Sequence, residues 1–331
     1  MNMTKNDVKI FDEVIPLKPN FYPWTKDFIL AMHNGFWTDA EFNFQSDLQD
    51  FKVNLSEQER EIIVRSLSTI GQLEISVKKF WAKLGDNLPH PALNDLGYVM
   101  ANIEVIHGDA YSRLLEVLGI EDSFDRILKE PIIKGRVNYL RKHLRKFHED
   151  NKKQFVYSLI LFTLFVENIA LFSQFYTINY FGKFKNLLKD TNKQVEYTSR
   201  EEDLHAKVGI KIINVIRKEY PELFDEELEN KIISEAAEAI EHEFKIVEWI
   251  VNGYSNDNLN SSILKEFIKN RMNEALNEIG FKKIFDIDNE LIKKTIWFDE
   301  QLLANSKQDF FAGRPVEYSK NSQSFDESDL F

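Results

Sequence analysis

Two glutamate–histidine pairs in the sequence have the spacing of metal ligands on a helix. Glu104 precedes His107 by three residues, and Glu202 precedes His205 by the same interval. Because residues i and i+3 share one face of an α-helix, each pair can present a carboxylate and an imidazole to the same neighbour. Either pair alone is compatible with a solvated helix surface, but each lies on a face that is otherwise apolar or small. The two pairs are therefore candidate metal ligands.

Two further glutamates stand alone within apolar sequence. Glu167 lies at the centre of the run SLILFTLFVENIALFSQFY, and Glu74 is in helical register with large apolar residues on both sides. A buried, unpaired carboxylate is strongly unfavourable, so each must be protonated, paired with a cation or bound to a metal. For Glu74 considered alone, an ion-paired or partly exposed side chain is the plainer interpretation.

The four sites together form a more specific pattern. One glutamate on each of two helices, with Glu-x-x-His on each of two others, is the ligand set of ferritin-like dimetal carboxylate bundles. Bridging carboxylates can hold two divalent cations about 3.5–4 Å apart, and imidazoles suit iron and manganese. The pattern predicts a dinuclear metal centre that would also neutralise the buried charge of Glu167. Its six ligands would be Glu74, Glu104, His107, Glu167, Glu202 and His205.

Long helices are needed to bring these residues together. Ser56 with Glu59 three residues later is a capping box that starts one of them, and Pro221 ends another. Short connections between long amphipathic segments predict an all-α, ferritin-like bundle of residues 1–303. The polar segment 304–331 is predicted to be a flexible tail. Helices are predicted over 25–37, 56–87, 91–118, 131–148, 152–181, 191–220, 225–254 and 261–279.

Composition excludes several classes of protein. The net charge of −12 argues against a nucleic-acid partner or an anionic membrane surface. The apolar run around Glu167 is about long enough to cross a membrane, but its polar residues and its flanks favour a helix buried in a bundle. The N-terminus lacks the apolar region of a signal peptide, so we expect a cytoplasmic protein. The absence of cysteine excludes disulfides, thiolate zinc sites and a cysteine nucleophile within this chain.

The chain resembles the small, radical-generating subunit of class I ribonucleotide reductase. The motifs QLEISVKKFW, ANIEVIHGDAYSRLL, FVENIALFSQF and SREEDLHAKVG carry the resemblance, which extends from about Phe21 to Phe331. It implies the same six ligands and a homodimer whose metal centre generates a one-electron oxidant for a catalytic large subunit that reduces ribonucleotides. It also implies oxygen or superoxide as activator, with a small flavoprotein as a candidate activation partner.

The resemblance further implies a path for the electron. Tyr111 falls where the family keeps its radical tyrosine, and Trp37 matches a tryptophan linked to a ligand histidine through an acidic residue, here Glu201. Tyr318 resembles the tail tyrosine that relays the radical. The terminal peptide FDESDLF resembles the segment that docks on the large subunit, so the tail is expected to form that contact.

The first ligand departs from the common family pattern. It is usually aspartate in members that store a tyrosyl radical on a di-iron site, whereas here it is Glu74. This favours a manganese-containing pair, dimanganese or Mn/Fe, over di-iron, with Tyr111 reduced, although the ligand types admit both metals.

Three other interpretations stay open at the level of sequence. They are a ferritin-like oxidase that acts on a substrate bound at the metals, a metal-storage protein, and a helical interaction protein without a catalytic site. The first two leave Trp37, Tyr318 and the terminal peptide unexplained, and the third leaves the buried glutamates unexplained.

Overall fold

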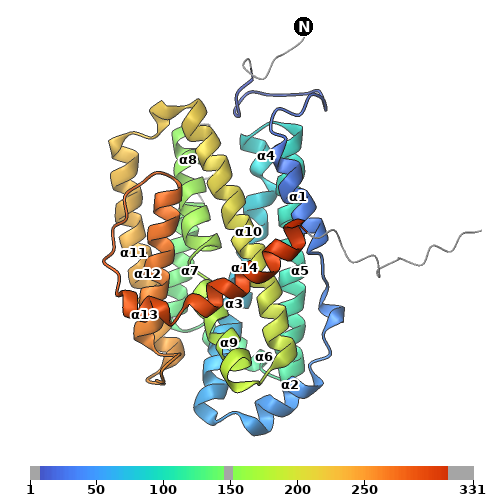
Figure 1. Cartoon of the computed structure of the whole chain (residues 1–331), viewed down its shortest axis with the longest axis vertical. Helices are drawn as coiled ribbons and strands as arrows, with labels where there is room; N and C mark the ends of the chain where they lie inside the picture. The colour runs from blue at the N-terminus through green and yellow to red at the C-terminus, as the bar shows by residue number, and fades with distance from the viewer. Residues whose placement is uncertain (1–7, 145–151, 312–331) are drawn as a thin grey trace, which may run out of the picture.

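The computed structural model of the chain describes residues 8–144 and 152–311; within these ranges the side chains of residues 72, 74–76, 139–144 and 304–311 are not described. Almost all of the described chain is helical, and it contains no β-strand. The long helices run along one axis as an elongated bundle, and the last helix crosses them obliquely (Figure 1). The predicted all-α, ferritin-like architecture is confirmed.

Five long helices form most of this bundle, joined by shorter helices and helical turns. The long ones are α3 (Glu57–Ala82), α5 (Pro91–Leu118), α10 (Lys189–Glu219), α11 (Glu226–Val251) and α12 (Ser261–Glu278). The shorter α-helices are α1 (Trp24–Asn34), α2 (Gln45–Gln49), α4 (Leu84–Asn87), α6 (Glu121–Ile127), α7 (Pro131–Leu144), α8 (Lys152–Leu161), α9 (Phe172–Lys185), α13 (Asn289–Lys293) and α14 (Ile296–Phe311). The helical turns are η1 (Asp39–Glu41), η2 (Asp50–Asn54), η3 (Phe162–Glu167) and η4 (Pro221–Leu223).

The helix termini follow from local sequence signals. The N–H of Glu59 bonds to the Ser56 hydroxyl, and the Glu59 carboxylate accepts from the Ser56 N–H at 2.9 Å, which completes the predicted capping box at the start of α3. Pro91 opens α5, and Gly119 closes it with a φ of 66°, a conformation that favours glycine. The predicted limits of α5 are confirmed.

The predicted single helix over residues 152–181 is wrong, because the chain breaks in its middle. α8 leads into the π-helical turn η3, four residues of turn follow, and α9 begins at Phe172. At the break the Ala170 N–H donates to the Phe165 carbonyl at 2.8 Å, one residue further back than in an α-helix. The break comes directly after Glu167, so the local geometry of this carboxylate differs from that on a regular helix.

The apolar segment is a core element. One continuous stretch of helix and turn, residues 152–185, is long and apolar enough to cross a membrane, and its most apolar window is wholly buried inside the bundle. Every residue from 155 to 181 is buried. The prediction of a buried bundle helix is thus confirmed over the membrane-helix interpretation.

Several other boundaries differ from those predicted. α1 ends at Asn34, which places Trp37 in the loop that follows, and the predicted helix 56–87 divides into α3 and α4. The backbone of α14 continues to Phe311, past position 304 where the sequence predicted the tail to begin.

Candidate metal centre

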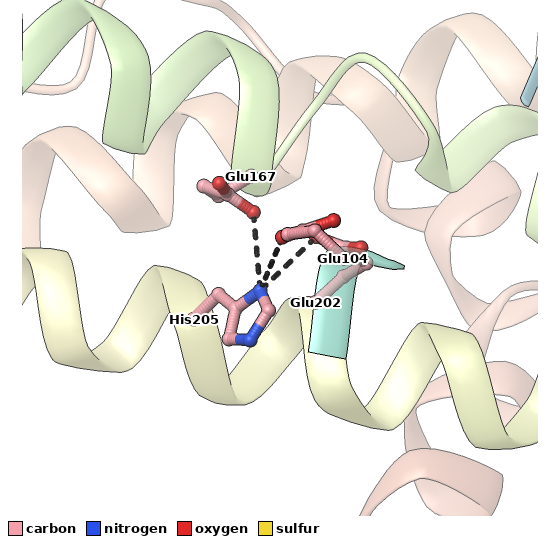
Figure 2. A group of neighbouring side chains, drawn as sticks. All are labelled: Glu104, Glu167, Glu202 and His205. Carbon is pink, nitrogen blue, oxygen red and sulfur yellow. Dashed lines mark ion pairs between the residues drawn. The ribbon is translucent and has the colours of Figure 1, made fainter. Parts of the chain in front are cut away.

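Four of the predicted ligands meet in the interior of the bundle. Glu104 comes from α5, Glu167 from the end of η3, and Glu202 and His205 from α10. One ligand atom of each residue lies within 4.8 Å of those of the others, and all four residues are buried. Figure 2 shows the three carboxylates converging on one ring nitrogen of His205. This arrangement has the residue types and the spacing that a cation site requires.

Within this group, His205 lies closer to Glu104 than to Glu167 or Glu202. His205 Nδ1 lies 2.9 Å from Glu104 Oε1, and 3.7 Å from both Glu167 Oε2 and Glu202 Oε2. Glu202 precedes His205 by three residues, so one turn of α10 presents both side chains, as the sequence predicted.

His107 joins this group through one ring nitrogen and faces outwards with the other. Its Nδ1 lies 3.0 Å from Glu202 Oε1 and 3.5 Å from Glu104 Oε2, on the side of the cluster. Its Nε2 lies 2.8 Å from Glu201 Oε2. A carboxylate on the far nitrogen fixes the orientation and tautomer of a ligand imidazole. Glu201 is placed to do this for His107.

Trp37 extends this contact towards the surface. Its Nε1 donates to Glu201 Oε2 at 2.8 Å, the same oxygen that faces His107. The indole also stacks on the imidazole of His107, with ring centroids 6.1 Å apart and planes 24° apart. Both Trp37 and Glu201 line a cleft of about 1030 Å³ between α1, α9, α10 and α14. A continuous set of polar contacts therefore joins the buried carboxylates to an open face.

A second tryptophan contact was missed by the sequence analysis. Trp81 Nε1 donates to Glu167 Oε1 at 2.7 Å, and both residues are completely buried. Gly97 lets α5 approach this region, because a Cβ there would lie 2.6 Å from the Trp81 carbonyl oxygen. Trp81 follows Glu74 by seven residues in the motif QLEISVKKFW, which places both on one face of α3 but does not pair Trp81 with Glu167.

The packing of η3 against α10 depends on a glycine. A Cβ at Gly209 would lie 2.2 Å from Thr163 Oγ1 and 2.6 Å from its Cγ2. Thr163 is β-branched and buried, so it has few alternative conformations. Gly209 follows His205 by one helical turn, and it allows the turn that carries Glu167 to lie directly against the helix that carries His205.

Charge in the cluster is shared unevenly. Burial, and then the charge of Glu202, raise the pKa of Glu167 well above its usual value. Burial opposes ionisation of Glu202 as well, but contacts with His107 and His205 lower its pKa overall. For His205, burial lowers the pKa, but contacts with the neighbouring carboxylates outweigh this and raise it well above the usual value. Without cations the cluster therefore retains protons, which bound cations would displace.

The buried oxygen and nitrogen atoms of the cluster are suited to binding cations. Among the described side chains, both oxygens of Glu104, Oε2 of Glu167, Oε1 of Glu202 and both ring nitrogens of His205 are buried and make no hydrogen bond. Leaving buried acceptors without donors is costly, and several carboxylate oxygens beside imidazole nitrogens are ligands suited to iron or manganese. A metal centre accounts for these otherwise unsatisfied atoms.

The remaining predicted residues are placed only in part. Glu74 belongs to α3, but its side chain lies outside the described residues. Tyr111 is 1% exposed on α5, one turn after His107, and its Cβ would lie 3.7 Å from a Cβ added at Gly71 of α3. Tyr318 and the peptide FDESDLF lie outside the described residues. The functional roles of all ten predicted site residues stay predictions.

Sequence comparison places the chain in a known family. The family model described as "Ribonucleotide reductase, small chain" matches residues 14–291, most of the chain. The chain belongs to this family. A curated relative, the ribonucleoside-diphosphate reductase subunit beta of Chlamydia pneumoniae, is 24% identical over 93% of this chain and 90% of its own length. The resemblance noted in the sequence is thus confirmed, and the protein is an oxidoreductase subunit with a metal-binding, ferritin-like core.

Solved structures agree on the fold. The ribonucleotide reductase R2 subunit from Clostridium botulinum superimposes with a TM-score of 0.77 at 22% identity, covering 85% of this chain and 88% of that one. The dimanganese(II)-NrdF of Streptococcus sanguinis gives a TM-score of 0.71 at 17% identity, covering 86% of this chain and 99% of that one.

Proposed function

We propose that this small chain generates a one-electron oxidant at a dinuclear metal centre and passes it to the large subunit of a ribonucleoside-diphosphate reductase. One observation carries the proposal: the hydrogen-bonded connection from the cluster through His107 and Glu201 to Trp37 at the cleft. A metal-storage protein has no use for such a connection. An oxidase acting at the metals would need no link from them to an open face.

The six residues predicted from sequence would hold the two cations. When bound, the cations supply the one-electron oxidising power that no side chain of this chain provides by itself. The chain's own part is to keep the site dry and to hold its ligands, since the four clustered ligands and His107 are at most 1% exposed. Glu202 and Glu104 each face both histidines, so these two carboxylates would hold the cations together with His107 and His205.

Trp37 and Glu201 would carry the oxidising equivalent outwards. Trp37 can give up an electron, and its Nε1 proton already lies on a hydrogen bond to Glu201 Oε2. The Glu201 carboxylate accepts from Trp37 Nε1–H and faces His107 Nε2, so it would stabilise positive charge that develops on either ring. The indole borders the cleft, which supports docking of the large subunit on this face.

We also propose a manganese-containing pair, dimanganese or Mn/Fe, rather than di-iron, with Tyr111 reduced. Glu74 at the first ligand position supports this. A relative of similar fold has been solved as a dimanganese(II) protein. Oxygen or superoxide is the proposed activator, with a small flavoprotein as a candidate to supply it. Electron paramagnetic resonance of active protein should show metal-centred signals, and activity that tracks a tyrosyl signal would reverse the assignment.

The proposed assembly is a cytoplasmic homodimer that binds the large subunit through its C-terminal tail. The ferritin-like domain would comprise residues 1–303, and the tail would comprise residues 304–331, beginning within the last turns of α14. Tyr318 would relay the radical, and the terminal acidic peptide would dock. Deleting the last seven residues should abolish association with the large subunit and leave metal binding intact, whereas Tyr318→Phe should preserve both and abolish nucleotide reduction.

The function is tested by reconstitution. Purified apoprotein is loaded with Mn²⁺, Fe²⁺ or both and is activated with oxygen or with superoxide. Its metal content is measured, and it is mixed with the large subunit from the same organism, a dithiol reductant and a ribonucleoside diphosphate. We expect two metal ions per chain and deoxyribonucleotide formation that requires both subunits. Glu202→Ala should bind fewer than two ions and give no product. Full metal content in Glu202→Ala would contradict the ligand assignment, and absence of product from loaded wild-type protein would contradict the function.

A further inference from the structure

Arg271 on α12 binds the chain at the point where the buried helix breaks. Its Nε donates to the Asn168 main-chain oxygen at 2.9 Å, and its Nη2 donates to Asn168 Oδ1 at 2.6 Å. The guanidinium also lies over the ring of Phe172, with Cζ 3.4 Å from the centroid. Only 11% of the Arg271 side chain is exposed. One arginine thus holds both the main chain and the side chain of the residue that follows Glu167.

The break itself creates the need for this donor. In a continuous α-helix the Asn168 carbonyl would accept the N–H of Phe172. Here the Phe172 N–H donates to the Ile169 carbonyl at 3.2 Å instead. A buried carbonyl without a partner is unfavourable, and Arg271 supplies the missing donor. The arginine therefore stabilises the broken geometry over a regular helix, in which the Phe172 N–H would compete for the same oxygen.

The same guanidinium also reaches the helix that carries Glu202. Its Nη2 lies 3.7 Å from Asp203 Oδ1 on α10, and its Nη1 lies 4.0 Å from Asp299 Oδ1 on α14. Asp203 is the residue directly after Glu202. Arg271 consequently contacts Asn168, which follows Glu167, and Asp203, which follows Glu202. These contacts hold the end of η3 and α10 in a fixed position relative to each other.

We infer that Arg271 is a positioning residue of the metal centre: by holding Asn168, it keeps the π-helical turn and fixes the Glu167 carboxylate relative to Glu202. This rests on the function proposed above. Without Arg271 the turn can shift its register towards a regular helix, and a shift of one residue rotates a side chain by about 100° around the helix axis. Glu167 would then leave the cluster, although no atom of Arg271 touches it.

The test compares two arginines with similar local contacts. Arg271→Met keeps most of the apolar stem and removes the donors. Arg217→Met is the control. Arg217 on α10 also donates to a main-chain carbonyl, that of Ile279, and lies over Phe281, with Cζ 5.4 Å from the ring centroid. It lies about 22 Å further along α10 than Glu202, so it is remote from the cluster. Apoprotein of full length is titrated with Mn²⁺, free Mn²⁺ is followed by electron paramagnetic resonance, and unfolding of the apoprotein is measured in urea.

We expect both variants to be less stable than wild type. Only Arg271→Met should lose affinity for at least one of the two Mn²⁺ ions, by about tenfold or more, which is the usual effect of removing a residue that orients a metal ligand. Arg271→Lys, which retains the charge but not the paired donors, should bind Mn²⁺ with intermediate affinity. Wild-type affinity in Arg271→Met would overturn the inference, as would an equal loss in Arg217→Met.

A milder variant covers the case in which Arg271→Met does not fold. Asn168→Ala removes the side-chain amide, and with it the Oδ1 acceptor, but leaves the bond from Arg271 to the main chain. We therefore expect a several-fold loss of Mn²⁺ affinity, and unchanged affinity would overturn the inference. Wild-type protein that binds no Mn²⁺ would overturn the proposed function and this inference with it. Normal binding by wild type and Arg271→Met alike overturns the inference alone.

Discussion

The indole nitrogen of Trp81 donates a hydrogen bond of 2.7 Å to Oε1 of Glu167, with both side chains fully enclosed. This contact leaves Glu167 Oε2 as the oxygen that points to the cluster, 3.7 Å from His205 Nδ1. One carboxylate oxygen of Glu167 is therefore held by the hydrogen bond from Trp81, and the other faces the cluster. The side chain has this orientation without a bound cation.

Replacing this tryptophan should weaken metal binding. Trp81→Phe keeps an aromatic ring but removes the donor, so the carboxylate can rotate, and we expect a loss of about tenfold in Mn²⁺ affinity. Trp297→Phe is a suitable control, because Trp297 Nε1 donates to the Tyr176 hydroxyl at 3.1 Å rather than to the cluster. Equal Mn²⁺ affinities of the two variants in a chelator competition would argue against the role of Trp81.

Glu201 should matter for electron transfer more than for metal binding. Glu201→Gln removes the negative charge between His107 and Trp37, and its amide has one acceptor oxygen where the carboxylate has two. We expect metal content near that of wild type, with nucleotide reduction lowered at least about 100-fold. Glu201→Asp keeps the charge and should retain measurable turnover. Near-normal turnover of Glu201→Gln in the two-subunit assay would show that this connection is not used.

Close packing at Gly209 gives a stability prediction. Gly209→Ala places a methyl group against Thr163, so η3 must move away from α10, and we expect a loss of about 1–3 kcal/mol in the free energy of unfolding. Gly108→Ala is the matched control, since the nearest atom to its added Cβ is Lys78 Nζ at 3.6 Å; alanine there should be neutral or stabilising. Urea denaturation of both apoproteins measures their free energies of unfolding. Equal values for the two variants would show that η3 and α10 are not in close contact at Gly209.

Much of the fold and part of the site could be predicted from sequence because their signals are local. Glu104 and His107, like Glu202 and His205, share a face through helical spacing alone, and the capping box fixed the start of α3. The contact between Trp81 and Glu167 joins residues 86 positions apart, which no periodicity encodes.

The break after Glu167 was also beyond sequence reasoning. The run from Ser158 to Tyr176 contains no glycine or proline to mark an interruption. Its broken geometry depends on a donor from α12, Arg271, which lies far along the chain. Tertiary contacts of this kind override the helix propensity of an apolar run.

A buried ion pair away from the cluster predicts a pH dependence of stability. Arg136 Nε lies 3.0 Å from Glu243 Oε1, and burial raises the pKa of Glu243 to about 7 against the opposing effect of Arg136. Because the pKa of Glu243 is higher in the folded than in the unfolded state, its protonation stabilises the fold. This contribution is fully present below the pKa of the unfolded state and is lost as the pH rises through the pKa of the folded state. The window is therefore from about pH 4.5 to pH 7.

The matching variant is Glu243→Gln, which cannot titrate. The unfolding free energy of wild type minus that of Glu243→Gln should fall by about 3 kcal/mol across this window and be level on either side of it. The subtraction removes the titration of all other groups. The cost of leaving Arg136 unpaired in the variant is the same at every pH, so it shifts the difference without changing its dependence on pH. A difference that does not change between pH 4.5 and pH 7 would contradict the raised pKa of Glu243.

The enclosed segment from residue 155 to residue 181 has a consequence for synthesis in the cell. The helices that cover it include α10, α11 and α12, and all three follow it along the chain (Figure 1). At about 5–20 residues per second, ribosomes need roughly 5–20 s to complete α12 after this segment has been made. During that interval an apolar stretch of near membrane-spanning length has no partner helices on those sides. Nascent chains of this protein should therefore depend on chaperones at this stage, and truncation before Ser261 should yield insoluble product.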